Sequence, residues 1–241
     1  MATGAYLKLL IHSALADPLQ FATRINYFCP ICSYAGHFPS FGKPPQRYGI
    51  CPRCHSLERD RLYAYFMGDW HDPFLSGRDV IHFAPEPALY KLLTEHYAPN
   101  SYITADPTPD VADRREDMTA LTFDDNSMDI IIANHVLEHI EDDETAMAEC
   151  YRVLRDGGQF WITVPIVEGW TRSYETPAVT TPEAREWHYG RYDHFRVYGR
   201  DLVNRLEAAG FDVSRYCASP QACLDSAITY GETIFVAVKY S

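Results

Sequence analysis

From Asp79 to the end of the chain, short apolar runs alternate with segments whose apolar residues recur at helical spacing. The segments of helical spacing predict helices, at 87–97, 142–154 and 200–210. The apolar runs predict strands, at 80–83, 101–106, 128–136, 159–166, 211–217 and 233–240. Strands that alternate with helices indicate an α/β fold with a doubly wound, mostly parallel sheet. Ligands of such sheets lie beyond the carboxyl ends of the strands.

The chain before Asp79 has a different pattern. Its first 24 residues read as a short amphipathic packing helix, and residues 56–70 predict a second helix with Ser56 as its N-cap. The apolar face of this second helix is expected at Leu57, Leu62, Tyr65 and Phe66. We therefore predict three parts: an N-terminal helix over 1–24, a small module with its connecting helix over 25–78, and the main α/β domain over 79–241.

Four of the seven cysteines form two tight pairs, Cys29-Pro-Ile-Cys32 and Cys51-Pro-Arg-Cys54. Each C-P-x-C segment can make a turn that aims two thiolates at one ion, and two such turns complete the tetrahedral set of a structural zinc site. The segment between the pairs is rich in Gly, Pro and aromatic residues, as expected of a hairpin stabilised by a metal. The pattern resembles a zinc ribbon and predicts one structural zinc ion; four free thiols in a loop are the alternative.

Charge and hydropathy restrict the function classes. The chain carries a net charge of −12, and from Asp79 onward it has 13 basic and 28 acidic residues. Such an acidic domain weighs against a broad nucleic-acid surface. No apolar run approaches the roughly 18 residues of a membrane span. Because the start of the chain lacks the features of a secretory signal, we expect a cytoplasmic protein without membrane contact.

An acidic residue closes the second predicted strand. Asp106 follows Ala84 by 22 residues, a spacing that suits a carboxylate accepting hydrogen bonds from both ribose hydroxyls of a nucleoside. Asp117 precedes the next strand and is a candidate acceptor for an adenine amino group. The alternative for Asp106 is a turn-forming role before Pro107.

Three further segments follow in order: DIIIANHVLEHI at 129–140, RVLRDGGQFWITVP at 152–165 and LEAAGF at 206–211. Together with Asp106 and Asp117, this succession resembles the class I S-adenosylmethionine-dependent methyltransferases, particularly their small-molecule branch, from about 79 to 240. The resemblance implies a Rossmann-like fold, S-adenosylmethionine as cofactor and methyl transfer as the reaction.

In that family the first strand ends in an acid, and three alternating glycines cradle the methionine part of the cofactor. Here His82 takes the place of the acid, and Ala84, Glu86 and Ala88 take the glycine positions. Glutamate at the middle position does not allow the same close approach if the backbone needs a positive φ. The resemblance implies that the cofactor is held by His82, Ala84, Pro85, Glu86, Asp106, Asp117, Met118, Asn134 and His135.

Two interpretations of the glycine-free loop stay open. In the first, the loop is rebuilt, Pro85 stiffens it, and Glu86 offers its carboxylate to the ammonium of the cofactor. In the second, the cofactor site is lost and the domain survives as a scaffold. We favour binding, because Asp106 and Asp117 retain the acids that would hold the nucleoside.

Histidines are the candidates for a catalytic base. His135 ends the third strand and His139 follows it, whereas His194 lies in an insert at about 165–198, where the family places a cover over the substrate. Methyl transfer is an in-line displacement, so most of the catalysis comes from holding the acceptor close and aligned. A base is needed only if the acceptor keeps its proton, and a histidine suits that task. A pair of helix-edge histidines that pack on the sheet is the alternative for His135 and His139.

The insert is rich in aromatic residues, which suit the wall of a pocket for an organic acceptor. An ordinary packed loop is the alternative. His194 is the first candidate in it for a base or a substrate anchor, and His188 is the second. Arg191 and Arg196 are candidates for holding an anionic group of the acceptor.

We therefore expect methyl transfer to a small-molecule acceptor, such as a sugar nucleotide or a secondary metabolite. One alternative is an RNA-base methyltransferase, because some of those enzymes carry an N-terminal zinc ribbon. Another is a non-catalytic binding module with a methyltransferase-like body. A homodimer is compatible with the sequence. In the RNA alternative the basic side of the ribbon would be formed by Arg47, Arg53, Arg59 and Arg61.

Overall fold

The computed structural model describes residues 25–42, 49–69 and 75–240, and these form two compact units. The cysteine unit combines the described residues up to Asp69 with 86–96 and 216–233. The sheet unit combines 75–85, 97–215 and 234–240. The helix expected over 1–24 lies outside the described residues, and so does Arg47.

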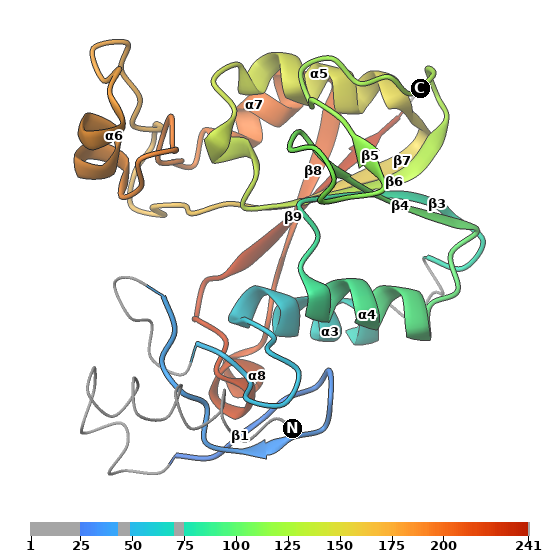
Figure 1. Cartoon of the computed structure of the whole chain (residues 1–241), viewed down its shortest axis with the longest axis vertical. Helices are drawn as coiled ribbons and strands as arrows, with labels where there is room; N and C mark the ends of the chain where they lie inside the picture. The colour runs from blue at the N-terminus through green and yellow to red at the C-terminus, as the bar shows by residue number, and fades with distance from the viewer. Residues whose placement is uncertain (1–24, 43–48, 70–74, 241) are drawn as a thin grey trace. The chain divides into compact units, whose positions relative to one another are not determined.

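A seven-stranded sheet forms the centre of the sheet unit (Figure 1). Its strand order is β5-β4-β3-β6-β7-β9-β8; the neighbours from β5 to β7 pair in parallel, and β9 runs antiparallel to β7. This architecture confirms the predicted α/β fold with a mostly parallel sheet. The strands are β3 (Asp79–Phe83), β4 (Ser101–Asp106), β5 (Arg114–Arg115), β6 (Met128–Asn134), β7 (Leu154–Thr163), β8 (Phe211–Cys217) and β9 (Thr233–Lys239).

Helices α5 (Asp143–Val153) and α7 (Leu202–Ala208) lie side by side against this sheet (Figure 1). The α5 helix begins at Asp142, whose carboxylate accepts the backbone N–H of Thr145 at 3.0 Å and so satisfies a free donor of the first turn. Its apolar stripe is buried in the core of the unit against strands β3, β6 and β7. The stripe consists of Ala146, Met147, Cys150 and Val153.

Two shorter elements lie where the chain leaves the sheet. The 3₁₀ helix η1 (Leu137–His139) follows β6 after two residues. Helix α6 (Pro182–Tyr189) lies in the insert between β7 and α7. It starts with a Thr181 cap and Pro182 in its first turn, and it ends at Gly190 with a φ of 83°.

The cysteine unit contains a two-stranded antiparallel hairpin and three helices. Helix α3 contacts both α4 and α8, and α8 contacts the hairpin. The buried Arg61 of α3 donates to the carbonyl oxygens of Ser56, Ser226 and Ala227 at 2.7–2.8 Å, which ties α3 to the end of α8. The elements are β1 (Tyr27–Phe28), β2 (Ala35–Gly36), α3 (Glu58–Asp69), α4 (Pro87–His96) and α8 (Pro220–Ser226).

Three local predictions differ from the structure. Ser56 does not cap α3, which begins at Glu58; the Ser56 hydroxyl lies 3.4 and 3.3 Å from the sulfurs of two cysteines. The strand expected over 159–166 begins earlier, since β7 runs from Leu154 to Thr163 and carries a bulge near its start. Helices α6 and α8 were not predicted, although each has a hydroxyl cap followed by proline.

No described helix has the length and apolar character that a membrane crossing requires.

Candidate functional site

The four paired cysteines meet in the cysteine unit. Their sulfur atoms all lie within 4.8 Å of one another, and the Cys29–Cys54 and Cys32–Cys51 sulfurs are each 3.6 Å apart. A tetrahedral ion with metal–sulfur bonds of about 2.3 Å separates its ligands by about 3.8 Å, so these distances fit a four-thiolate site. Interactions with the thiols of Cys51 and Cys54 hold the pKa of Cys29 well below its usual range. The cluster can therefore hold one metal ion.

The two C-P-x-C turns have the same backbone geometry. Ser33 donates its N–H to the carbonyl of Cys29 at 2.8 Å, and His55 donates to that of Cys51 at 2.9 Å. Each donor follows the second cysteine of its pair and has a left-handed φ, 58° for Ser33 and 63° for His55. Non-glycine residues rarely adopt this conformation without a local reason. The repeated geometry indicates that both turns are shaped to present two sulfurs to a common centre.

The arginines of the expected basic side are engaged elsewhere in the cysteine unit. Arg61 is buried, as described above, and Arg59 forms an ion pair with Glu86 at 2.8 Å. Arg53 is exposed and donates to the carbonyl of Cys32. The prediction of a basic face that includes Arg59 and Arg61 is therefore wrong, because tertiary contacts use both guanidinium groups.

In the sheet unit, three candidate cofactor residues lie side by side. Phe83 of β3 is in register with Ala105 of β4 and with Ala133 of β6. The next residues of these three adjacent strands are Ala84, Asp106 and Asn134. They mark the carboxyl ends of three parallel strands, where ligands of α/β sheets bind.

The end of β3 is strained. Ala84 has a φ of 45°, a left-handed conformation that costs a non-glycine residue on the order of 1–3 kcal/mol. Its N–H donates to the Ala105 carbonyl at 2.9 Å. Glu86 is not among the described residues with positive φ, so the strain falls on Ala84. His82 is fully buried, with Nδ1 2.7 Å from the hydroxyl of Tyr102 on β4.

The acidic candidates make short-range turns. The Oδ1 atom of Asp106 accepts the Thr108 N–H at 2.7 Å, as in the turn that we considered as its alternative role. Oδ1 of the exposed Asp117 accepts both the N–H and the hydroxyl of Thr119, at 2.9 and 2.8 Å. In both carboxylates Oδ2 has no protein hydrogen bond within the described part of the chain, which leaves it available to a ligand. Met118 is buried in the core cluster.

The end of β6 carries a second strained residue. His135 has a φ of 53° and donates its N–H to the Thr163 carbonyl at 2.8 Å. The preceding Asn134 is buried, and its side-chain oxygen accepts the hydroxyl of Thr163 at 3.1 Å. The turn directs the chain into η1, which brings Glu138 to His135: the Nδ1 and Oε1 atoms are 3.4 Å apart.

A compact cluster of ionisable groups lies after β6. One donor atom from each of Glu138, His139 and His194 lies within 4.8 Å of the others. The rings of His139 and His194 meet edge to face, with centroids 4.6 Å apart. Burial lowers the pKa of His194, against the opposing influence of Glu138, so its imidazole is neutral near pH 7. Glu138 was not among the predicted site residues, because a sequence does not reveal that this carboxylate is buried.

The insert is fastened to η1 by Arg196. This buried side chain donates to the carbonyls of Leu137, Ile140 and Glu141 and forms an ion pair with Glu175 at 2.6 Å. Protein carbonyls and Glu175 thus already engage the Arg196 guanidinium, which argues against the predicted role of holding an anionic group of the acceptor, although the side chain also borders a cavity. Arg196 instead sets the position of the neighbouring His194.

The two other candidates of the insert lie outside the cluster. Arg191 forms a bidentate ion pair with Asp193, with N–O distances of 3.0 and 3.1 Å. His188 is exposed on α6, with Nδ1 2.6 Å from the Tyr174 hydroxyl. The structure thus brings His135, His139 and His194 together and separates His188 from them.

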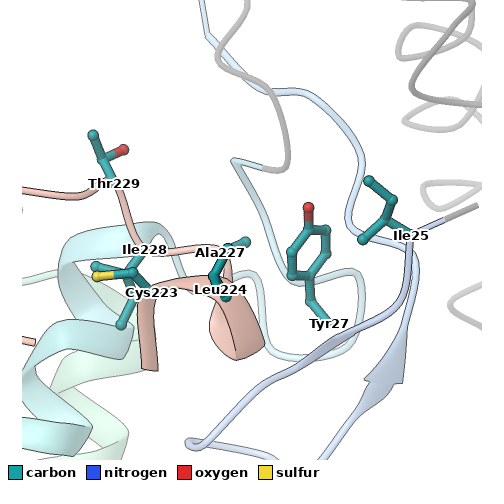
Figure 2. Close-up of a pocket in the computed structure, with 7 residues that line it drawn as sticks. All are labelled: Ile25, Tyr27, Cys223, Leu224, Ala227, Ile228 and Thr229. Carbon is teal, nitrogen blue, oxygen red and sulfur yellow. The ribbon is translucent and has the colours of Figure 1, made fainter. Parts of the chain in front are cut away.

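Two cavities of similar size differ in chemistry. One of about 370 Å³ lies within the insert and has polar and charged walls that include Glu141, Glu175 and Arg196. The other, of about 320 Å³, lies in the cysteine unit between the start of the described chain and α8, as Figure 2 shows. Its lining of Ile25, Leu224 and five further residues is mainly apolar. Without charged groups to orient a polar acceptor, this second cavity is the weaker candidate for an acceptor site.

Comparison with known protein families identifies the fold. The family described as methyltransferase domain matches residues 71–162. A Mycolicibacterium smegmatis protein described as a probable S-adenosylmethionine-dependent methyltransferase is 29% identical over 105 residues, which is 44% of this chain and 37% of that protein. The match therefore spans little more than a third of that relative.

Solved structures agree with this match at the level of the fold. One chain from the complex between a Haloferax volcanii methyltransferase activator and a putative methyltransferase has a TM-score of 0.56 and 16% identity, covering 76% of this chain and 92% of its own. An S-adenosylmethionine-dependent methyltransferase from Mesorhizobium loti has a TM-score of 0.51 and 14% identity, covering 70% of this chain and 94% of that chain.

Proposed function

We propose, from the match of residues 71–162 to the methyltransferase domain family and from the likeness of the fold to solved methyltransferases, that this protein transfers the methyl group of S-adenosylmethionine to a small-molecule acceptor. The observation that carries the proposal is the alignment of Ala84, Asp106 and Asn134 at the carboxyl ends of adjacent strands. The free oxygen of Asp106 supports its role as the ribose acceptor. Asp117 and the remaining candidates of the loop are proposed to complete the cofactor site.

The chemistry of the insert supports a small organic acceptor. Four of its aromatic side chains are substantially exposed: Trp170, Tyr174, Trp187 and Tyr192. The insert thus offers both exposed aromatic groups and a cavity with charged walls, which suit an acceptor that has a ring or chain and polar substituents. The sheet unit also supplies three histidines beside the end of β6. We propose that these residues position the acceptor, with His194 as the central group.

We further propose that the four cysteines hold one zinc ion with a structural role. Four thiolates complete the tetrahedral coordination of zinc and leave no position for a substrate. In this account zinc stabilises the hairpin of the cysteine unit, and the methyl-transfer chemistry belongs to the sheet unit.

Calorimetric titration of the full chain with S-adenosylhomocysteine tests the proposed function. We expect micromolar binding, as an order of magnitude, and at least about a tenfold loss in Asp106→Ala, since each lost hydrogen bond to a charged group is worth roughly 1.5–3 kcal/mol. The matched control is Asp212→Ala, which removes an exposed carboxylate from β8. Absence of binding by a folded, zinc-loaded protein would leave the non-catalytic scaffold as the better account.

A further inference from the structure

The carboxylate of Glu138 is buried without a hydrogen bond. Its side chain is 1% exposed, and neither oxygen has a hydrogen-bond partner in the described chain. The nearest ionisable contact is His135, at 3.4 Å. Removing a carboxylate from water without compensation costs several kcal/mol, so buried carboxylates are normally hydrogen-bonded, paired or bound to a metal. This side chain therefore points to a cation that binds at the cluster.

The two imidazoles beside Glu138 are oriented as metal ligands are. Nδ1 of His194 lies 3.2 Å from the carbonyl oxygen of Tyr189, which makes Nδ1 the donor and leaves the Nε2 lone pair free. Nδ1 of His139 lies 3.3 Å from the carboxylate of Asp193. Metal-bound histidines almost always donate their second ring nitrogen to a carbonyl or a carboxylate; the His194 ring satisfies this condition, and the His139 ring has a carboxylate within ion-pair distance.

The backbone fixes the relative position of these donors. Phe195, directly after His194, donates its N–H to the carbonyl of Glu138 at 2.8 Å. Arg196 binds the carbonyls of η1 and of the segment that follows it. The contacts of the two residues that follow His194 therefore hold the insert against η1. Such support is what a preorganised metal site requires.

We propose that Glu138, His139 and His194 bind one divalent transition-metal ion in the sheet unit. Two imidazoles and one carboxylate form a three-ligand set that leaves coordination positions open, as in catalytic rather than structural metal sites. Imidazole nitrogen favours Mn²⁺, Fe²⁺, Co²⁺ or Zn²⁺ over Mg²⁺ and Ca²⁺, which prefer oxygen ligands alone. The site is separate from the four-cysteine cluster in both sequence and chemistry.

The open positions suit an acceptor that binds through a hydroxyl oxygen; this role rests on the proposed methyltransferase function. Coordination lowers the pKa of a bound hydroxyl, whose proton passes to water. The oxygen then forms a bond to the methyl carbon of S-adenosylmethionine, while the carbon–sulfur bond breaks and its electron pair stays on sulfur. The products are a methyl ether and S-adenosylhomocysteine. His139 and His194 thus act as ligands that position the acceptor.

Manganese binding tests the site directly. The full chain, already loaded with zinc, is titrated with Mn²⁺ alone, and free Mn²⁺ is followed by its electron paramagnetic resonance signal. Thiolate sulfur is a poor ligand for Mn²⁺, so the cysteine cluster does not interfere. We expect one bound ion per chain, with affinity at least about 100-fold weaker in Glu138→Gln and in His194→Gln. Changes to groups that only hydrogen-bond the ligands already cost 10–100-fold in metal affinity.

Matched variants separate metal ligation from general damage. Glu141→Gln and His188→Gln make the same substitutions at exposed or peripheral positions, and we expect both to bind Mn²⁺ like the parent. Asp193→Asn, which alters the group behind His139, should weaken binding about tenfold. A parent protein that binds no Mn²⁺ at millimolar concentration, or a Glu138→Gln variant that binds it as tightly, would overturn the proposal.

Measuring S-adenosylhomocysteine binding by the same proteins distinguishes the proposed metal site from the proposed methyltransferase function. Loss of the metal site in Glu138→Gln with cofactor affinity intact supports the metal assignment and shows that the variant is folded. Mn²⁺ binding by a protein that does not bind S-adenosylhomocysteine would leave the metal site standing and remove the methyltransferase role.

Discussion

Arg59 of α3 donates from Nε to Oε1 of Glu86 at 2.8 Å, and this ion pair gives the glycine-free loop a structural role within the cysteine unit. By the sequence resemblance, Glu86 takes the position of the middle glycine of the class I methyltransferases. Both side chains are mostly buried, so the pair is shielded from solvent more than a surface salt bridge is. Burial lowers the pKa of Arg59, but the charge of Glu86 outweighs this and raises it overall.

The first prediction concerns the coupling between these two residues. We expect Glu86→Gln and Arg59→Met each to lower the free energy of unfolding by about 1–3 kcal/mol, because each leaves a largely buried charge without its counter-ion. The double variant should lose less free energy of unfolding than the sum of the losses in the two single variants. Urea denaturation of the four proteins gives the coupling energy, and strictly additive losses would contradict the ion pair.

The same variants test Glu86 as a cofactor ligand. If its carboxylate binds the ammonium of S-adenosylmethionine, Glu86→Gln should weaken S-adenosylhomocysteine binding about tenfold. Arg59→Met keeps that carboxylate and should retain most of the affinity. Calorimetry on both variants measures the difference. Equal affinities in parent and Glu86→Gln would mean that the loop serves only as a turn between β3 and α4.

The strain at Ala84 predicts a stabilising substitution. Ala84→Gly removes the Cβ from a left-handed residue, whereas the extra freedom of glycine in the unfolded chain costs about 0.5–1 kcal/mol. We expect a net gain of about 0.5–1 kcal/mol in the free energy of unfolding. Ala88→Gly, the same change inside helix α4, should destabilise by about 1 kcal/mol or more. A loss of stability in Ala84→Gly would refute the strain.

Asp60 predicts a pH dependence of stability. Its carboxylate accepts the Leu57 N–H at 2.8 Å, and burial raises the pKa of Asp60 from about 3.8 to about 7, with the charge of Glu86 acting in the same direction. The folded protein therefore binds a proton more tightly than the unfolded chain. The resulting stabilisation is complete below about pH 3.8 and is lost as the pH rises through 7.

Asp60→Asn should remove this dependence, because an amide keeps the acceptor oxygen without ionising. Between pH 5.5 and 8.5 the parent should lose on the order of 2 kcal/mol relative to Asp60→Asn, at about 1.4 kcal/mol per pKa unit. Urea denaturation at the two pH values provides the measurement. Parallel stability profiles for the two proteins would show that Asp60 ionises as in the unfolded chain.

Zinc removal tests the cysteine cluster. Metal analysis should find one zinc ion fewer in Cys51→Ser than in the parent, with a clear fall in the melting temperature, because the binding free energy of a structural metal ion contributes to folding. Cys217→Ser, which changes an exposed thiol outside the cluster, is the matched control. Equal zinc contents in Cys51→Ser and in the parent would contradict the four-thiolate assignment.

The sheet could be predicted from sequence because the strands of a parallel sheet are continuous apolar runs. The run at 128–136 became β6, and the strand order places Asn134 at its end next to the end of β3, with Asp106 on the other side of β3. The four-cysteine cluster could be predicted from sequence as well, since the spacing of the pairs specifies two turns that can share an ion. In these cases the information is local in the sequence.

Tertiary contacts could not be predicted in the same way. Arg196 has the appearance of a surface cation in the sequence, yet the structure uses it to bind the carbonyls of η1. Ser56 has the signature of a helix cap, but its hydroxyl lies against the sulfurs of the cluster. Glu138 stands between Leu137 and His139 without any sign of burial. Each outcome depends on a chain segment distant in sequence.

A crystal structure of the protein soaked with S-adenosylhomocysteine tests the central proposal most directly. The account predicts a bound nucleoside at the carboxyl ends of β3, β4 and β6, with Asp106 within hydrogen-bond distance of the ribose hydroxyls. The open side of the homocysteine sulfur should face the cluster of Glu138, His139 and His194. No bound ligand at saturating concentration in a protein that retains its zinc, or a ligand bound elsewhere, would contradict it.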